Sequence, residues 1–212
     1  MRALEGPLGD AAAAARGGEL IVFPTDTVYG IGTRPDDPAA TARVFEAKRR
    51  PLDLELPVLV ATVQAARAVA AFDERAERLA AALWPGPLTL VMPRGAHAST
   101  WDLGGDPATV GVRAPHHPMA LALLAKTGPL AVTSANLSGR PPAETCDELH
   151  ACFGDRVSVY LCQEDPMDGV ASTVLDLAHG PATVIREGSL PREALIKLLP
   201  DELSLLDSSP SS

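Results

Sequence analysis

The 212-residue sequence has few aromatic residues, few cysteines and a shortage of positive charge. Phe, Trp and Tyr make up 4% of the chain, and its net charge at pH 7 is −9. Non-specific binding to nucleic acid needs many Lys and Arg side chains that neutralise phosphates, so this acidic balance opposes it. Any site for a polyanion must therefore be a small cluster of positive charge in an otherwise acidic protein.

Long hydrophobic runs are also absent. No apolar run approaches the roughly 20 residues that span a bilayer, and the N-terminus lacks a basic flank followed by a signal-type segment. Hydrophobic residues make up 46% of the chain and charged residues 21%, which is typical of a soluble globular protein with a sizeable core. We therefore expect a cytoplasmic protein with no membrane partner.

Cysteine and histidine form no recognisable ligand pattern. The three cysteines, Cys146, Cys152 and Cys162, show no C-x-x-C pair and no metal-ligand spacing, and the five histidines form no motif. We therefore predict no metal site within the protein. The cysteines are expected to be reduced thiols, in the core or on the surface.

Apolar periodicity indicates alternating helices and strands without an internal repeat or a clear linker. Strands are predicted at 19–23, 57–60, 88–92, 109–113, 130–133, 157–161, 172–176 and 182–185. Helices are predicted at 8–16, 39–48, 73–83, 118–126, 146–153 and 191–199, the second capped by Asp37-Pro38 and the fifth by a Thr145/Glu148 capping box. This pattern predicts one α/β domain around a mixed sheet over residues 1–200, and a disordered tail over 201–212.

Polar residues follow the first predicted strand. Pro24 ends the strand, and Thr25, Asp26 and Thr27 come directly after it. In open α/β sheets, ligands bind at the C-terminal edge of the strands. An equally open alternative is an ordinary turn in which Asp26 and Thr27 bond to the local backbone.

Two further segments carry side chains suited to anions. Lys48 and Arg50 lie in a basic cluster at a predicted helix end, where both should be exposed; a point charge and a planar fork together suit a triphosphate. The alternative is that they only complement the helix dipole. The loop 133–139 offers Ser134 and Asn136 after a strand, or forms a locally bonded turn with Gly139 at positive φ. Because neither a P-loop nor a Rossmann glycine motif is present, a nucleotide would need such groups.

Read together, three of these segments resemble the YrdC family, whose members are threonylcarbamoyl-AMP synthases. They are PTDTVYG at 24–30, K-x-R-P at 48–51 and TSANLSG at 133–139, with further similar pieces at 84–90, 109–118, 172–174 and 185–188. The resemblance runs from about residue 19 to about residue 199. It implies an α/β fold with a twisted mixed sheet, flanked by helices, and a deep concave site.

The resemblance also implies a reaction. L-threonine, bicarbonate or CO2, and ATP as a substrate would give threonylcarbamoyl-AMP and pyrophosphate, with Mg²⁺ accompanying the phosphates. The product would pass to a separate tRNA threonylcarbamoyl transferase complex for t6A37 modification of tRNA, with little direct nucleic-acid binding by this chain.

Residue roles follow where this sequence matches the family. Lys48 and Arg50 are similar to the family's catalytic, phosphate-binding pair. The further contacts that the resemblance implies for ATP are Thr109, Ser134, Asn136 and Arg186, and those for threonine are Thr27, Arg113 and Ser172. Arg113 would meet the threonine carboxylate, although it could also be a surface strand arginine. Asp26 could act as a base or a metal contact, but the motif assigns it no role.

The sequence departs from the family after K-x-R-P, and two other functions stay open. Leu54 and Glu55 stand where relatives often have a cation and a proline, which puts the lip of the site in question. One alternative function is an RNA-binding or ribosome-maturation module, against which the acidity of the chain counts. The other is a carbamoyl-transfer domain that uses carbamoyl phosphate, which would normally be fused to other domains.

Overall fold

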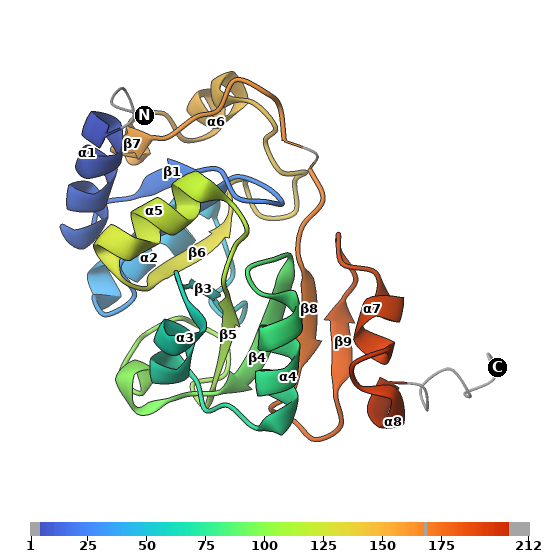
Figure 1. Cartoon of the computed structure of the whole chain (residues 1–212). Helices are drawn as coiled ribbons and strands as arrows, with labels where there is room; N and C mark the ends of the chain where they lie inside the picture. The colour runs from blue at the N-terminus through green and yellow to red at the C-terminus, as the bar shows by residue number, and fades with distance from the viewer. Residues whose placement is uncertain (1–4, 168, 204–212) are drawn as a thin grey trace.

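The strands of the computed structural model, which describes residues 5–167 and 169–203, form one mixed sheet (Figure 1). Within these residues the sheet has nine strands in the order β7-β1-β2-β6-β3-β5-β4-β8-β9. Their bounds are β1 Ile21–Phe23, β2 Gly30–Thr33, β3 Val58–Leu59, β4 Leu88–Pro93, β5 Thr109–Arg113, β6 Leu130–Ser134, β7 Val159–Tyr160, β8 Thr173–Asp176 and β9 Thr183–Arg186. The predicted α/β domain with a mixed sheet is confirmed. The depth of a concave site stays a prediction.

Helices flank this sheet, and two of the predicted caps are confirmed. The bounds are α1 Glu5–Arg16, α2 Pro38–Lys48, α3 Val63–Val69, α4 Glu74–Leu83, α5 Pro118–Thr127, α6 Cys146–Phe153, α7 Arg192–Ile196 and α8 Pro200–Leu203, with 3-10 turns η2 Ala96–Ala98 and η3 Gly154–Arg156. The Asp37 side chain caps α2, and Thr145 and Glu148 form the capping box of α6. No helix among the described residues is long and apolar enough to cross a membrane.

The two faces of the sheet are covered differently. Residues paired directly across neighbouring strands project to the same face of the sheet, so the strand register shows which side chains share a face. One face carries Ile21, Phe23, Leu130 and Val132, which pack with α1 and α5 into a separate apolar cluster. On the same face, beyond β3, lie Thr109, Gly111 and Arg113 of β5, together with polar side chains of β4 and β9. This stretch is where the candidate site residues lie.

The opposite face builds the main core. Its strands contribute buried residues such as Val22, Ile31, Val58, Leu90 and Val112, which pack with α2, α3 and α4. Alternating residues of the same strands therefore serve the core on one face and the candidate site on the other.

Sequence reasoning did not predict β2, because two of its four residues are glycines, which have low strand propensity. The structure shows why they are there. A Cβ atom at Gly32 would lie 2.4 Å from the carbonyl oxygen of Ala131, and one at Gly30 would lie 2.6 Å from Cγ1 of Val132. The strands β2 and β6 can therefore pair only with glycine at these positions.

The C-terminal segment also differs from expectation. The helix predicted at 191–199 is the short helix α7, and α8 follows it at Pro200–Leu203. The first three residues of the predicted tail, 201–203, therefore belong to a helix. The rest of the predicted tail, residues 204–212, lies outside the described residues.

The expectation that all three cysteines are reduced was wrong, because Cys146 and Cys162 form a disulfide. Their Cα atoms are 5.8 Å apart, within the usual range for such bonds. The amide of Leu161 extends the β1·β7 pairing by donating to Val22 O at 2.8 Å, and the segment after it meets the first residue of α6. Motif spacing could not reveal a pair that tertiary structure brings together. Cys152 is free, as expected.

Candidate functional site

Three guanidinium groups converge on the sheet face that α1 and α5 leave uncovered. Arg113 ends β5 and Arg186 ends β9, while Arg50 lies just after α2. Burial lowers the pKa of Arg113 and of Arg50, and the positive charge of Arg186 lowers both further. Arg186 is therefore within electrostatic reach of both other groups, and this acidic protein carries a local cluster of positive charge.

Arg113 is almost fully buried, with 5% of its surface exposed, which rules out a surface strand arginine. Its Nε donates to Gly86 O at 3.0 Å, and one Nη donates to Thr27 Oγ1 at 2.9 Å. Its other Nη donates to Oδ1 of Asp26, with which it forms a buried ion pair. The polar segment after β1 is thus held directly against Arg113.

Arg186 and Ser172 form a second group on the same face. Two nitrogens of Arg186 donate to Ser172 O at 3.1 and 2.9 Å, and one of them also reaches Ser172 Oγ at 3.3 Å. The hydroxyls of Ser172 and Thr89 are 2.9 Å apart. The two hydroxyls predicted to meet threonine, on Thr27 and Ser172, are therefore both buried and already bonded to the arginines.

Lys48 differs from the prediction that it would be exposed at a helix end, since only 1% of it is accessible. Its Nζ donates to Asn136 O at 2.6 Å, to Asn136 Oδ1 at 3.3 Å and to Ser134 O. Arg49 turns the chain at φ 52°, and Ser138 N donates to Lys48 O, so the loop after β6 closes over the lysine. Burial, and then the charge of Arg50, lower the Lys48 pKa to about 7.

The loop after β6 is tied together by its own side chains. Ser134 Oγ donates to Asn136 Oδ1 at 2.5 Å, and Asn136 Nδ2 donates to Leu137 O at 2.9 Å and to Arg140 O at 2.6 Å. Gly139 has the predicted positive φ, at 77°. The amide of Asn136 is thus engaged within the loop, and the lysine ammonium beneath it adds a positive charge.

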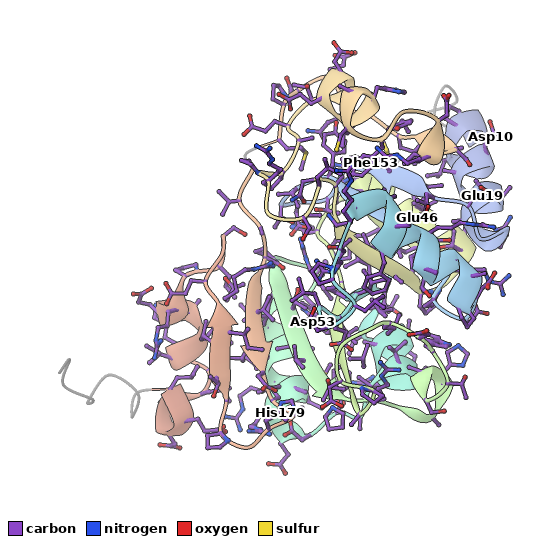
Figure 2. All side chains as sticks on the ribbon, turned by 180° about the vertical axis from the view of Figure 1, so that it is seen from behind. Asp10, Glu19, Glu46, Asp53, Phe153 and His179 are labelled. Carbon is purple, nitrogen blue, oxygen red and sulfur yellow. A yellow bond between two sulfur atoms is a disulfide. The ribbon has the colours of Figure 1, made fainter. Side chains whose placement is uncertain are left out.

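Arg50 is held at the site by the loop that follows it. Its Nε donates to Leu54 O at 3.1 Å and its Nη2 to Glu55 O at 2.9 Å. In Figure 2, Glu46 marks α2 and Asp53 marks this loop. Leu54 and Glu55, where the sequence departs from the family pattern, therefore hold Arg50 through their main-chain carbonyls. These bonds do not depend on which side chains the two residues carry.

The carboxyl group of Glu55 is buried near Arg94, with 3.8 Å between the closest atoms. Burial raises its pKa to about 8, against the opposing charge of Arg94. Thr109 lies beside this pair, because Arg94 Nε donates to its carbonyl oxygen at 2.7 Å. At about 3.3 Å per residue, Thr109 is about 13 Å along β5 from Arg113. A ligand that touched both would have to lie along the strand.

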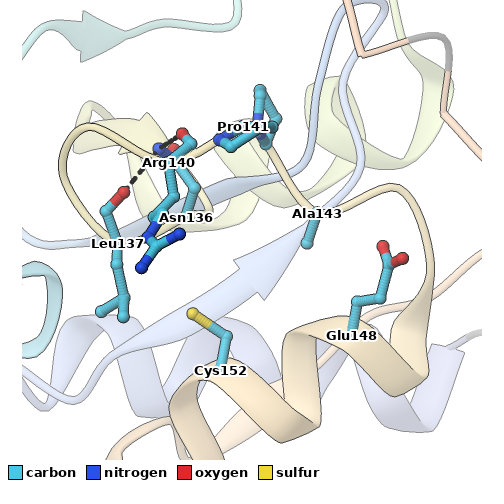
Figure 3. Close-up of a pocket in the computed structure, with 8 residues that line it drawn as sticks. Asn136, Leu137, Arg140, Pro141, Ala143, Glu148 and Cys152 are labelled. Atoms are coloured by element: carbon cyan, nitrogen blue, oxygen red, sulfur yellow. Dashed lines mark hydrogen bonds between the residues drawn. The ribbon is translucent and has the colours of Figure 1, made fainter.

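A hollow of about 300 Å³ adjoins the loop after β6 (Figure 3). Helix α6 lines one side with Glu148 and Cys152, and the loop lines the other with Asn136, Leu137, Arg140, Pro141, Pro142 and Ala143. Its volume is at the lower limit for small-molecule sites. Of these residues, sequence reasoning gave only Asn136 a binding role, because the loop and α6 come together only through tertiary packing.

Sequence reasoning gave no role to Asp26, although its position between two threonines of the same motif was a usable signal. Thr89 was missed because its hydroxyl lies in a strand of ordinary apolar pattern. Over the part of the chain that the structure describes, no three His, Cys, Asp or Glu side chains are grouped so that they could hold a metal ion.

Comparison with known proteins identifies the family. The family model Sua5_yciO_yrdC, whose description reads "Telomere recombination", matches residues 13–188. The chain belongs to the Sua5/YciO/YrdC family. A Mycobacterium tuberculosis relative is 39% identical over 190 residues, which are 89% of this chain and 87% of the relative. The threonylcarbamoyl-AMP synthase of Pyrococcus abyssi is 39% identical over 89% of this chain and 56% of its own length.

Solved structures of the Sua5/YciO/YrdC family have the same fold. Pyrococcus abyssi Sua5 in complex with L-threonine superposes with a TM-score of 0.86 and 38% identity, covering 92% of this chain and 57% of that one. Escherichia coli YciO superposes with a TM-score of 0.81 and 25% identity, covering 90% and 91% of the two chains. This chain thus spans about nine tenths of the YciO structure and about half of the P. abyssi Sua5 structure.

Proposed function

We propose that this protein is a threonylcarbamoyl-AMP synthase, which uses L-threonine, bicarbonate or CO2, and ATP. The observation that carries the proposal is the clustering of Arg186 with Arg50 and with Arg113, which pairs with Asp26, in an otherwise acidic chain. Such a site suits substrates that bring one carboxylate and several phosphate charges. The P. abyssi relatives, one named for this activity and one solved with L-threonine bound, support the assignment.

The reaction requires two bond-forming steps. The threonine amine forms an N–C bond with CO2, and two protons leave the original ammonium group to give a carbamate anion. A carbamate oxygen then attacks the α-phosphorus of ATP, and the bond to pyrophosphate breaks. Neither step needs a covalent bond to the protein, so positioning and charge stabilisation are its main tasks.

The site residues divide these tasks. Arg113 would bind the threonine carboxylate, with the Thr27 hydroxyl beside it. Arg50 and Arg186, whose guanidinium groups are positioned by backbone carbonyls, would hold the triphosphate as planar forks. Lys48 would act through the loop that contains Ser134 and Asn136, because its ammonium is bonded to that loop from below.

Mg²⁺ would enter with ATP as part of the substrate. Among the described residues, acidic side chains form no group that could hold the ion, and Asp26 is already paired with Arg113. The phosphates themselves would therefore supply the main ligands. Transfer of the product to a separate complex that modifies tRNA at t6A37, and a cytoplasmic location, belong to the same proposal.

Pyrophosphate release tests this function. The assay supplies ATP with threonine and bicarbonate together, and then omits each in turn. We expect release only with all three, and a large loss in Arg186→Ala, but not in Arg34→Ala, whose ion pair with Asp36 is exposed. Release that does not depend on threonine would overturn the proposal.

A further inference from the structure

Asp26 uses only one of its two carboxylate oxygens. Oδ1 accepts a hydrogen bond from Arg113, whereas Oδ2 is buried and accepts none from any described residue. The Asp26 side chain is 13% exposed, so its neighbourhood is mostly dry. Leaving a buried charged oxygen without a partner costs stability, which is typical of a group that functions with a ligand.

The residues around Asp26 indicate what kind of ligand its Oδ2 atom would bind. The described acidic residues form no metal-binding group with Asp26, which argues against a divalent cation. The nearest charged partner is Arg113, whose own neighbours are the hydroxyl of Thr27 and the carbonyl of Gly86. His117 is near enough for the Asp26 charge to raise its pKa, but burial lowers that pKa overall. A small cationic donor is therefore the complement of Oδ2.

A free amino acid carries such a donor next to a carboxylate. Its ammonium and carboxylate groups are separated by a single carbon, and the Arg113–Asp26 pair presents charges of the opposite signs at similarly short range. We propose that Asp26 binds the α-ammonium group of the amino-acid substrate while Arg113 binds its carboxylate. The inference rests on the proposed function and deepens it.

This arrangement balances charge before and after binding. Arg113 and Asp26 form one ion pair within the protein, and with the amino acid bound there would be two pairs between protein and substrate. When the ammonium becomes a carbamate, its positive charge is lost and a negative charge appears. Asp26 then repels that charge, while Arg186, whose charge reaches Arg113, attracts it. Asp26 would therefore favour the substrate and direct the carbamate away from itself.

Equilibrium binding to the full chain without ATP tests the role of Asp26. The ligands are L-threonine and (R)-3-hydroxybutanoate, which keeps the carboxylate and the hydroxyl but lacks the amino group. In Asp26→Asn we expect the Kd of threonine to rise about 10- to 100-fold, the scale of a lost charged hydrogen bond. The Kd of 3-hydroxybutanoate should stay the same or fall, because Arg113 is no longer shared with an anion.

A purely structural Asp26 gives a different result. If it only holds Arg113 in place, Asp26→Asn weakens both ligands by the same factor, and this outcome, or no change for threonine, overturns the inference. Asp36→Asn, which breaks an exposed Arg–Asp pair, is the matched control and should leave both Kd values unchanged.

Asp26→Ser keeps an acceptor without the charge, and should give the same contrast if the Asn variant does not fold. A folded parent protein that binds no threonine would overturn the proposed function itself, before any variant is compared. A parent that binds threonine, with equal losses in the variants, would overturn only the role of Asp26.

Discussion

The buried ammonium of Lys48 should make ATP binding depend on pH. Burial, and then the charge of Arg50, lower its pKa from the usual 10.5 to about 7, so in the free protein the group is largely neutral at pH 8. A triphosphate held over the loop that contains Ser134 and Asn136 would bring negative charge close to Nζ and restore the ammonium. ATP binding should therefore take up a proton.

The magnitude follows from linkage. If bound ATP returns the Lys48 pKa to about 9 or more, about 0.8 proton is taken up per ATP at pH 8. The ATP affinity is then at its maximum below pH 7. As the pH rises from 7 to 9, the affinity falls by up to about tenfold per pH unit, which is at most about 100-fold in total. Above pH 7.5 the charge of the nucleotide itself changes little.

Calorimetric titration of ATP, in buffers with different enthalpies of ionisation, measures both the affinity and the proton uptake. In Lys48→Met, which keeps most of the length of the side chain without a titrating group, the affinity should be weak and flat across this pH range. In Arg50→Ala, the affinity should be lower at every pH, and its fall should begin at a higher pH than in the parent, because the charge that helps to lower the Lys48 pKa is gone. A parent protein with no proton uptake at pH 8 would refute the reasoning.

Other predictions concern the substrate and the stability of the fold. Arg113→Lys should raise the KM for threonine, serine and valine by similar factors in pyrophosphate release, since Lys cannot reproduce the fork that meets their shared carboxylate. Gly32→Ala should cost about 3 kcal/mol in urea unfolding, because its Cβ would meet Ala131 O at 2.4 Å. Gly9→Ala, which meets nothing within 4 Å in α1, should instead gain about 0.5–1 kcal/mol. Reducing the disulfide should lower the free energy of unfolding by about 3 kcal/mol, given its separation of 16 residues, and equal urea midpoints with and without dithiothreitol would contradict this.

Local signals predicted the elements that local chemistry determines. Strand β5 and helix α6 lie at the predicted residues, because an apolar run and a capping box define them. The motif indicated that Asp26 and Thr27 lie at the edge of a strand, whereas their contact with Arg113 appears only in the structure.

Features that depend on distant segments were not predictable in the same way. Lys48 looks like an exposed helix end, and only the loop that starts 86 residues later buries it. The glycines of β2 weaken its strand pattern, and their purpose appears only when β6 lies beside them. Cys146 and Cys162 likewise meet through the pairing of β7 with β1, at the opposite end of the chain.

The order of the strands has a consequence for synthesis on the ribosome. Strand β4 has β5 on one side and β8 on the other, and β8 is made only after about eighty further residues. Pairings between such distant segments form slowly. Arg113 and Asp26 emerge early, whereas Ser172 and Arg186 come from the last strands. A nascent chain would therefore lack Ser172 beside the amino acid and Arg186 beside the nucleotide, and could not join the two substrates until nearly all of it had left the exit tunnel.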